Sequence, residues 1–143
     1  DASRGWSRKI TLNKVLKLLV LIPAIIFVVT GIRWFVAPAE VASSFGLALS
    51  EGIGLSSQVG NLASFFITLG SCMLIALITE LRSWYYPPMM LLAITAVGRI
   101  VAWLLHGATL AVSQIMVEVT VALILLLASR HLPQENSIRD QRQ

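Results

Sequence analysis

Four long apolar runs, separated by short polar segments, dominate the hydropathy pattern of the chain. They cover residues 15–36, 59–81, 88–105 and 109–129. A bilayer hydrocarbon core of about 30 Å is crossed by roughly 20 apolar residues in a helix, and each run comes close to that length. Short links after the second and third runs favour helices that pack as antiparallel neighbours in sequence order. The pattern therefore predicts one membrane domain, an all-α antiparallel bundle of four transmembrane helices.

The composition agrees with a membrane domain and offers little for catalysis. Of the 143 residues, 57% are hydrophobic and only 13% are charged, so little material is left for a soluble domain. The single cysteine, Cys72, lies within the second run, which excludes a disulfide or a cysteine metal site. No His, Asp and Glu cluster has metal-ligand spacing, and no phosphate-binding loop or activated nucleophile is found. We therefore expect no metal, no cofactor and no enzymatic activity.

The basic residues flank the apolar runs and predict the orientation of the helices. They precede or enter the first run, follow the second, and follow the fourth: Arg4, Arg8, Lys9, Lys14, Lys17, Arg82, Arg130, Arg139 and Arg142. By the positive-inside rule, both termini are expected on the cytoplasmic side of a bacterial inner membrane, or on the corresponding side of an organellar one. The basic residues form no patch with interleaved aromatics, so no nucleic-acid partner is expected. The first run exceeds the roughly 7–15 residues of a secretory signal, so we expect it to be retained.

Two segments near the outer side show weaker patterns. Residues 39–57 are rich in Ala, Ser and Gly, and they are expected either as an interfacial helix or lid over the bundle or as an ordinary loop. In the second run, small or weakly polar side chains recur at intervals of three and four: Asn61, Ser64, Thr68, Ser71 and Cys72. Such a stripe is typical of a close helix–helix interface in lipid.

Arg99 and Glu118 are charged residues inside the third and fourth runs. An ionised side chain near the bilayer centre costs about 2.5–3.5 kcal/mol on insertion scales, so it normally faces the bundle interior and finds a partner. The two residues lie on either side of a predicted hairpin near His106 and Gly107. At about 1.5 Å per residue, each is roughly 14 Å from the hairpin centre. We therefore predict an ion pair in the outer half of the membrane.

This pair has three open interpretations. It is a structural salt bridge that fixes helix register, or part of an outward-facing pocket, or part of a proton relay. In the pocket, Arg99 would bind an anionic or carbonyl-bearing group and Glu118 would orient it or accept a proton. Other polar side chains extend the candidate ligand-binding set, which comprises Arg99, Glu118, Gln114, His106, Arg33 and Asn61. For His106 an ordinary position at a helix end is the competing interpretation, and for Arg33 an extension toward lipid headgroups.

The last two runs resemble a family of small four-span bacterial membrane proteins of unknown function. The resemblance rests on the segment VGRIVAWLLHGATLAVSQIMVEVTVALILLLASR, with Gly98 and Arg99 before the hairpin, Gly107 in it and Glu118 after it. The GIRWFVAP end of the first run, followed by Phe45-Gly46, is similar to the same family. The family often has Asp at the position of His106 and a polar or basic residue near Ser64. The resemblance implies the four-span architecture and no particular activity.

Three functions compete at this point. The first is a non-catalytic accessory or assembly subunit that packs against other integral membrane subunits of a larger complex, surrounded by membrane lipids. The second is a binder or carrier of a lipid, quinone or other amphiphile in a polar pocket around Arg99 and Glu118. A membrane enzyme or proton-coupled transporter that uses Glu118, the one carboxylate deep within a run, is the third.

Overall fold

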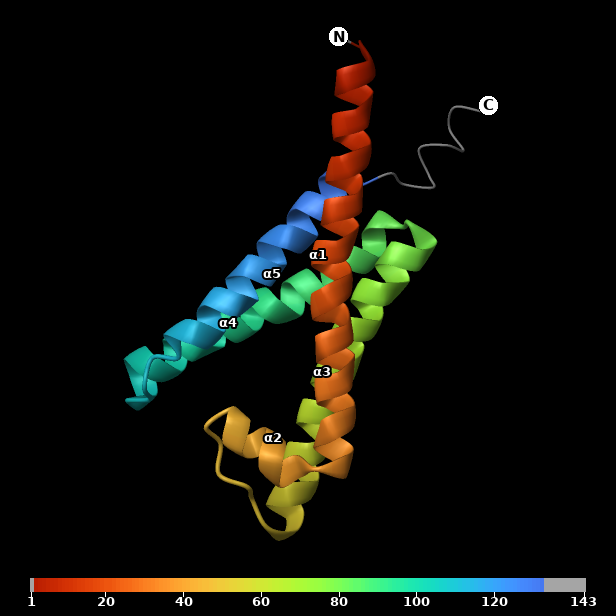
Figure 1. The fold of residues 1–143 in the computed structure, drawn as a ribbon. Coiled ribbons are helices and arrows are strands. Elements are labelled where there is room, and N and C mark those ends of the chain that lie inside the picture. Colours follow the sequence, from red (N-terminus) through yellow and green to blue (C-terminus); the bar gives the residue numbers. More distant parts are fainter. Residues whose placement is uncertain (1, 133–143) are drawn as a thin grey trace.

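The computed structural model describes the backbone of residues 2–132 and the side chains of residues 8–132. This part of the chain is helical and contains no strands (Figure 1). Its elements are α1 (Ala2–Val36), α2 (Pro38–Ser44), α3 (Gly52–Thr79), η1 (Arg82–Tyr85), α4 (Tyr86–His106) and α5 (Val112–His131). Four of these helices, α1, α3, α4 and α5, are long and apolar enough to cross a membrane. The predicted fold class, an all-α four-helix membrane bundle, is confirmed.

The helices extend beyond the apolar runs. At 35 residues α1 is about 52 Å long, more than a bilayer core requires, and its first turns project past the other helices (Figure 1). Residues 39–57, for which a helix or a loop was expected, contain most of α2, a connecting loop and the first turns of α3. Of the basic residues used for the orientation, Arg139 and Arg142 lie outside the described residues, as does the Arg4 side chain.

The link between the last two helices is longer than the predicted hairpin. Gly107 ends α4 with a φ of +65°, a conformation that glycine adopts without steric cost. The backbone N–H of Val112 then donates to the carbonyl of Leu110 at 2.9 Å, immediately before α5 begins. The link therefore spans residues 107–111, and α5 starts three residues later than the sequence pattern predicts.

α1 and α3 form the closest helix pair, through glycines that allow their backbones to approach. A Cβ built at Gly70 of α3 would lie 2.5 Å from the backbone oxygen of Ala24 in α1. A Cβ built at Gly31 of α1 would lie 2.9 Å from the backbone oxygen of Ala63 in α3. Small residues therefore join these two helices, as is usual in lipid, where association depends on close packing.

The residues at this interface differ from the predicted polar stripe. Asn61, Ser64 and Thr68 are exposed, whereas Ala63 and Gly70 are buried. The Ser64 hydroxyl donates to the carbonyl of Gly60 at 2.6 Å, one turn back in its own helix. Because this local bond satisfies the hydroxyl, Ser64 needs no partner on a neighbouring helix. The interpretation of the stripe as the helix–helix interface was therefore wrong for Asn61, Ser64 and Thr68, whereas Ser71 is half-buried and Cys72 is buried.

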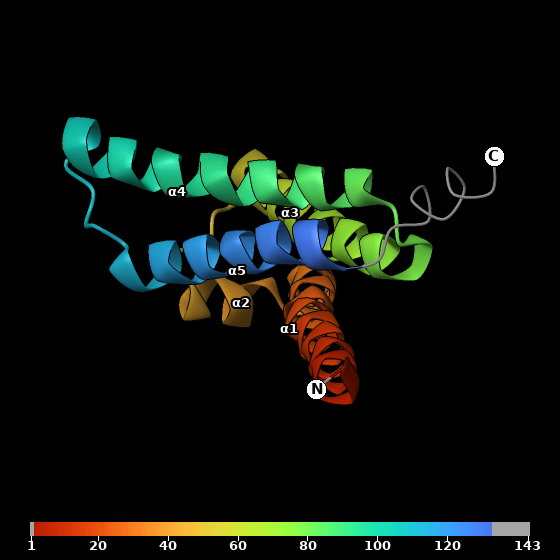
Figure 2. The same ribbon diagram turned by 90° about the horizontal axis from the view of Figure 1, so that it is seen from above.

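The core lies where the four spans converge, near the end of the bundle that carries η1. It contains residues of every span: Leu16, Val20, Ala24, Leu69, Met73, Ala76, Tyr85, Leu92, Val121, Leu125, Ala128 and Leu132. Toward the other end, α4 and α5 lean away from α1 and α3 (Figure 1). Seen from above, α4 and α5 lie side by side and cross the direction of α1 (Figure 2). The helix pairs therefore meet at one end and diverge at the end that carries α2.

Candidate functional site

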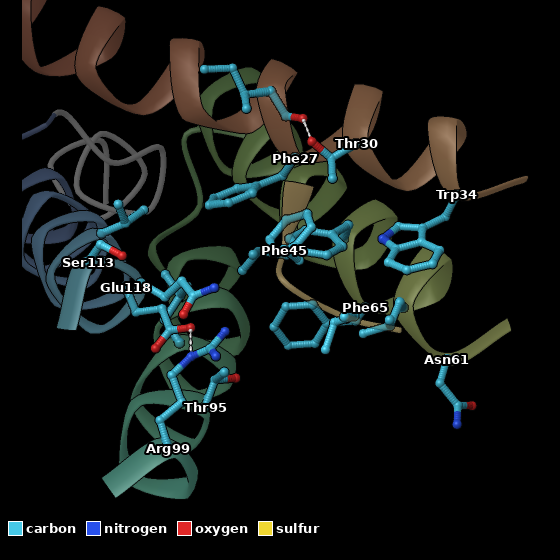
Figure 3. A pocket seen from close by; sticks show the side chains of 18 residues that line it. Phe27, Thr30, Trp34, Phe45, Asn61, Phe65, Thr95, Arg99, Ser113 and Glu118 are labelled. Carbon is cyan, nitrogen blue, oxygen red and sulfur yellow. Dashed lines mark hydrogen bonds and ion pairs between the residues drawn. The ribbon is translucent and has the colours of Figure 1, made fainter. Parts of the chain in front are cut away.

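A cavity of about 710 Å³ lies between the diverging helix pairs. Side chains of α1, α3, α4 and α5 line it, together with Phe45 and Leu47 from the loop after α2, and Figure 3 shows the Phe45 ring among them. Its wall is mainly apolar, with a few polar groups from α4 and α5. Cavities of about 300–1,000 Å³ with this kind of lining commonly hold small molecules.

Arg99 of α4 and Glu118 of α5 meet at the cavity wall. The Arg99 Nε donates to Glu118 Oε1 at 2.8 Å. The Glu118 side chain is only 10% exposed and the Arg99 side chain is 31% exposed, so the carboxylate is the more deeply enclosed partner. Arg99 lies seven residues before the end of α4 and Glu118 six residues after the start of α5. The hairpin therefore brings them to the same depth, as the sequence pattern predicted.

Two polar atoms in the cavity wall are buried without a hydrogen-bond partner. One is the second carboxylate oxygen of the ion pair, Glu118 Oε2, and the other is the indole nitrogen of Trp34. Trp34 is fully buried, near the outer end of α1. A buried polar group without a partner costs about 1–3 kcal/mol. Such groups are rare in folded proteins, so each of the two requires a structural explanation.

The other predicted site residues divide into two groups. Gln114 lines the cavity one turn before Glu118, and Asn61 is also in its lining, although its side chain is exposed and points away in Figure 3. His106, exposed at the end of α4, is not part of the lining. Arg33 is also outside the cavity, where its Nη2 donates to Glu40 Oε2 at 3.3 Å on the exposed surface. Of the candidate ligand-binding set, Arg99, Glu118, Gln114 and Asn61 therefore line the cavity, whereas His106 and Arg33 do not.

Sequence reasoning missed the aromatic part of the site. The Phe66 ring lies 5.3 Å from the Phe45 ring, 5.3 Å from the Phe65 ring and 6.1 Å from the Phe27 ring, measured between centroids. All four line the cavity. Phe45 follows α2, and no hydrophobic period in the sequence indicates that this segment folds back over α3. Trp34 looks like an interfacial anchor in the sequence, and only the packed structure shows that it is enclosed.

These features define the class of the protein: a multi-pass all-α membrane protein with a partly open cavity of ligand size. No group of His, Cys, Asp or Glu residues within the described part of the chain could hold a metal ion. The chain matches no family model, no curated protein and no solved structure. The resemblance to small four-span bacterial membrane proteins therefore stays a prediction from the quoted residues.

Proposed function

We propose that the protein binds a single amphiphile in the cavity between the α1–α3 and α4–α5 helix pairs. The polar end of the molecule lies against Arg99 and Glu118, and its apolar part lies along the phenylalanine side chains. The observation that carries this proposal is a cavity of ligand size with a mainly apolar wall that contains the Arg99–Glu118 pair, in which Glu118 Oε2 has no hydrogen-bond partner.

The Arg99 guanidinium supports the same proposal. Its Nε–H donates to Glu118, while its four Nη N–H groups have no partner among the described residues. Arginine has five donors in a planar fork, which suits it to binding oxygen atoms. Because Arg99 lines the cavity and is about one-third exposed, its free donors are available to a bound molecule.

An accessory role in a larger complex has weaker support. Its motivation was the broad apolar surface of the last two helices, and residues such as Ile94, Leu104, Met116 and Leu123 are indeed exposed. Lipid chains cover such a surface as well as protein does, so the surface itself favours neither. For the topology we propose that the η1 end, with Lys17, Arg82 and Arg130, faces the cytoplasm of a bacterial inner membrane.

The proposal is tested by filling the cavity without changing its charges. Val117 and Val119 are both exposed valines of α5, but only Val117 lines the cavity. Native mass spectrometry of the protein extracted in a mild detergent should show a bound lipid-sized molecule on the wild type and on Val119→Trp. Val117→Trp should lack it, because the indole occupies the same space.

Helix content by circular dichroism and elution volume in detergent report whether both variants are folded. A second matched pair uses charge: Arg99→Gln should lose the molecule, whereas Arg33→Gln, outside the cavity, should retain it. An equal amount of adduct on Val117→Trp and Val119→Trp, or a wild type that carries none, would contradict the proposal.

A further inference from the structure

The charges and hydrogen-bonding groups of the cavity restrict the chemistry of the head group that it can hold. We propose that the amphiphile has an uncharged head with a hydroxyl group, and that the cavity discriminates against anionic lipids. This inference rests on the proposed function and adds the chemical class of the ligand.

The net charge of the cavity wall is the first argument. Among its lining residues only Arg99 and Glu118 are charged, and they are bonded to each other at 2.8 Å. Arg33, the other cation near this end of the bundle, is bonded to Glu40 outside the cavity. An anionic head would therefore meet one positive and one negative charge, whose effects on it largely cancel. It would give up its hydration on entering this apolar space without gaining a net attraction.

The unpartnered atoms are the second argument. Glu118 Oε2 needs a donor, while the Arg99 Nη groups need acceptors. A carboxylate or a fully ionised phosphate head offers acceptors alone, and beside Glu118 Oε2 it would place two like charges together. An ammonium head offers donors alone and leaves Arg99 unsatisfied. A hydroxyl donates through its hydrogen and accepts through its oxygen, so it can serve both members of the ion pair.

The test uses two probes with the same hydrocarbon chain, oleyl alcohol and oleyl phosphate. Both are added in equal amounts to the delipidated full-length protein in detergent, and their adducts are compared by native mass spectrometry. The wild type should favour oleyl alcohol by about tenfold, equivalent to about 1.4 kcal/mol. A preference for oleyl phosphate would overturn the inference and leave the proposed function intact. The proposed function itself would be contradicted if neither probe formed an adduct with the wild type, or if Val117→Trp did not abolish the adducts that form.

A charge substitution makes the test specific to the ion pair. Glu118→Gln keeps the shape of the side chain and an oxygen for Arg99 Nε, but it gives the cavity one net positive charge. This variant should reverse the preference toward oleyl phosphate. The control variant Glu51→Gln removes one exposed negative charge outside the cavity and should still favour oleyl alcohol. An unchanged preference in Glu118→Gln, or a preference for oleyl phosphate in Glu51→Gln, would refute the charge argument.

Discussion

The two partners of the Arg99–Glu118 ion pair should respond differently when the other is removed. The perturbation is a neutral substitution on either side, Arg99→Gln or Glu118→Gln. The first leaves a carboxylate that is only 10% exposed, and the second leaves a guanidinium that is 31% exposed. In both variants the glutamine can still bond to the remaining partner, so the comparison measures how well each remaining charge is solvated.

The exposed fractions determine the expected magnitudes. Breaking a buried ion pair by removing one partner costs about 3–5 kcal/mol, because a charge is left uncompensated. The Glu118 side chain is only 10% exposed, so Arg99→Gln should cost about that much. Arg99 has a long flexible stem and partial access to the cavity and its contents. Glu118→Gln should therefore cost about 1–2 kcal/mol, closer to the value for one hydrogen bond with a charged partner.

A double-mutant cycle measures both the asymmetry and the coupling. The free energy of unfolding would be obtained in mixed micelles from denaturation curves of the wild type, the two single variants and the double variant. The coupling energy should be about 1–3 kcal/mol, the range for residues in direct contact. Equal costs for the two single variants, or a larger cost for Glu118→Gln, would refute the inference that Glu118 is the less solvated partner. A coupling energy near zero would show that the pair does not form.

Two further predictions concern the packing and the inner end of the bundle. Gly70→Ala should destabilise the protein by about 1–3 kcal/mol, because its Cβ would lie 2.5 Å from a backbone oxygen of α1. The control is Gly60→Ala in the same helix, where a Cβ meets nothing within 4 Å, and this variant should be neutral or slightly stabilising. Similar melting temperatures of the two variants would contradict the close approach of α1 and α3. Lys17 and Glu80 also form an ion pair, with 3.0 Å between Nζ and Oε1, but their side chains are 45% and 38% exposed. Lys17→Met should therefore cost less than about 1 kcal/mol, and less still in high salt; a melting-temperature loss as large as that of Arg99→Gln would contradict this ranking.

The four spans and the Arg99–Glu118 contact could be predicted from the sequence because both follow from strong, local rules. A bilayer excludes unpaired polar groups, so long apolar runs must be helices. Two charges within consecutive runs must turn inward, and the hairpin places them at one depth. Neither step requires knowledge of how the remaining side chains pack.

The helix–helix interfaces and the cavity could not be predicted, because they depend on which polar side chains form hydrogen bonds within their own helix and so need no partner on another helix. Ser64 bonds within its own helix, so its polarity says little about where α1 lies. Gly31 and Gly70 mark the interface only once the two helices are seen to approach there. A lid formed by residues 39–57 was one of the expectations, but a hydropathy pattern does not indicate where the Phe45 and Trp34 rings pack at the end of the bundle that carries α2.

The cavity and the unpartnered polar atoms follow from the same packing constraint. Close contacts between small residues join α1 to α3, and an ion pair joins α4 to α5, but neither type of contact joins the two pairs at their outer ends. If the bundle closed there, the Arg99–Glu118 pair would lie against Phe65 and its apolar neighbours. Arg99 would then lose its partial solvation, and Glu118 Oε2 would still have no hydrogen-bond partner. The hydroxyl-bearing ligand that we propose would satisfy these groups and fill the space at once. Its affinity and the stability of the outer half of the bundle are therefore coupled, since a ligand that binds only the folded protein stabilises it in proportion to its saturation.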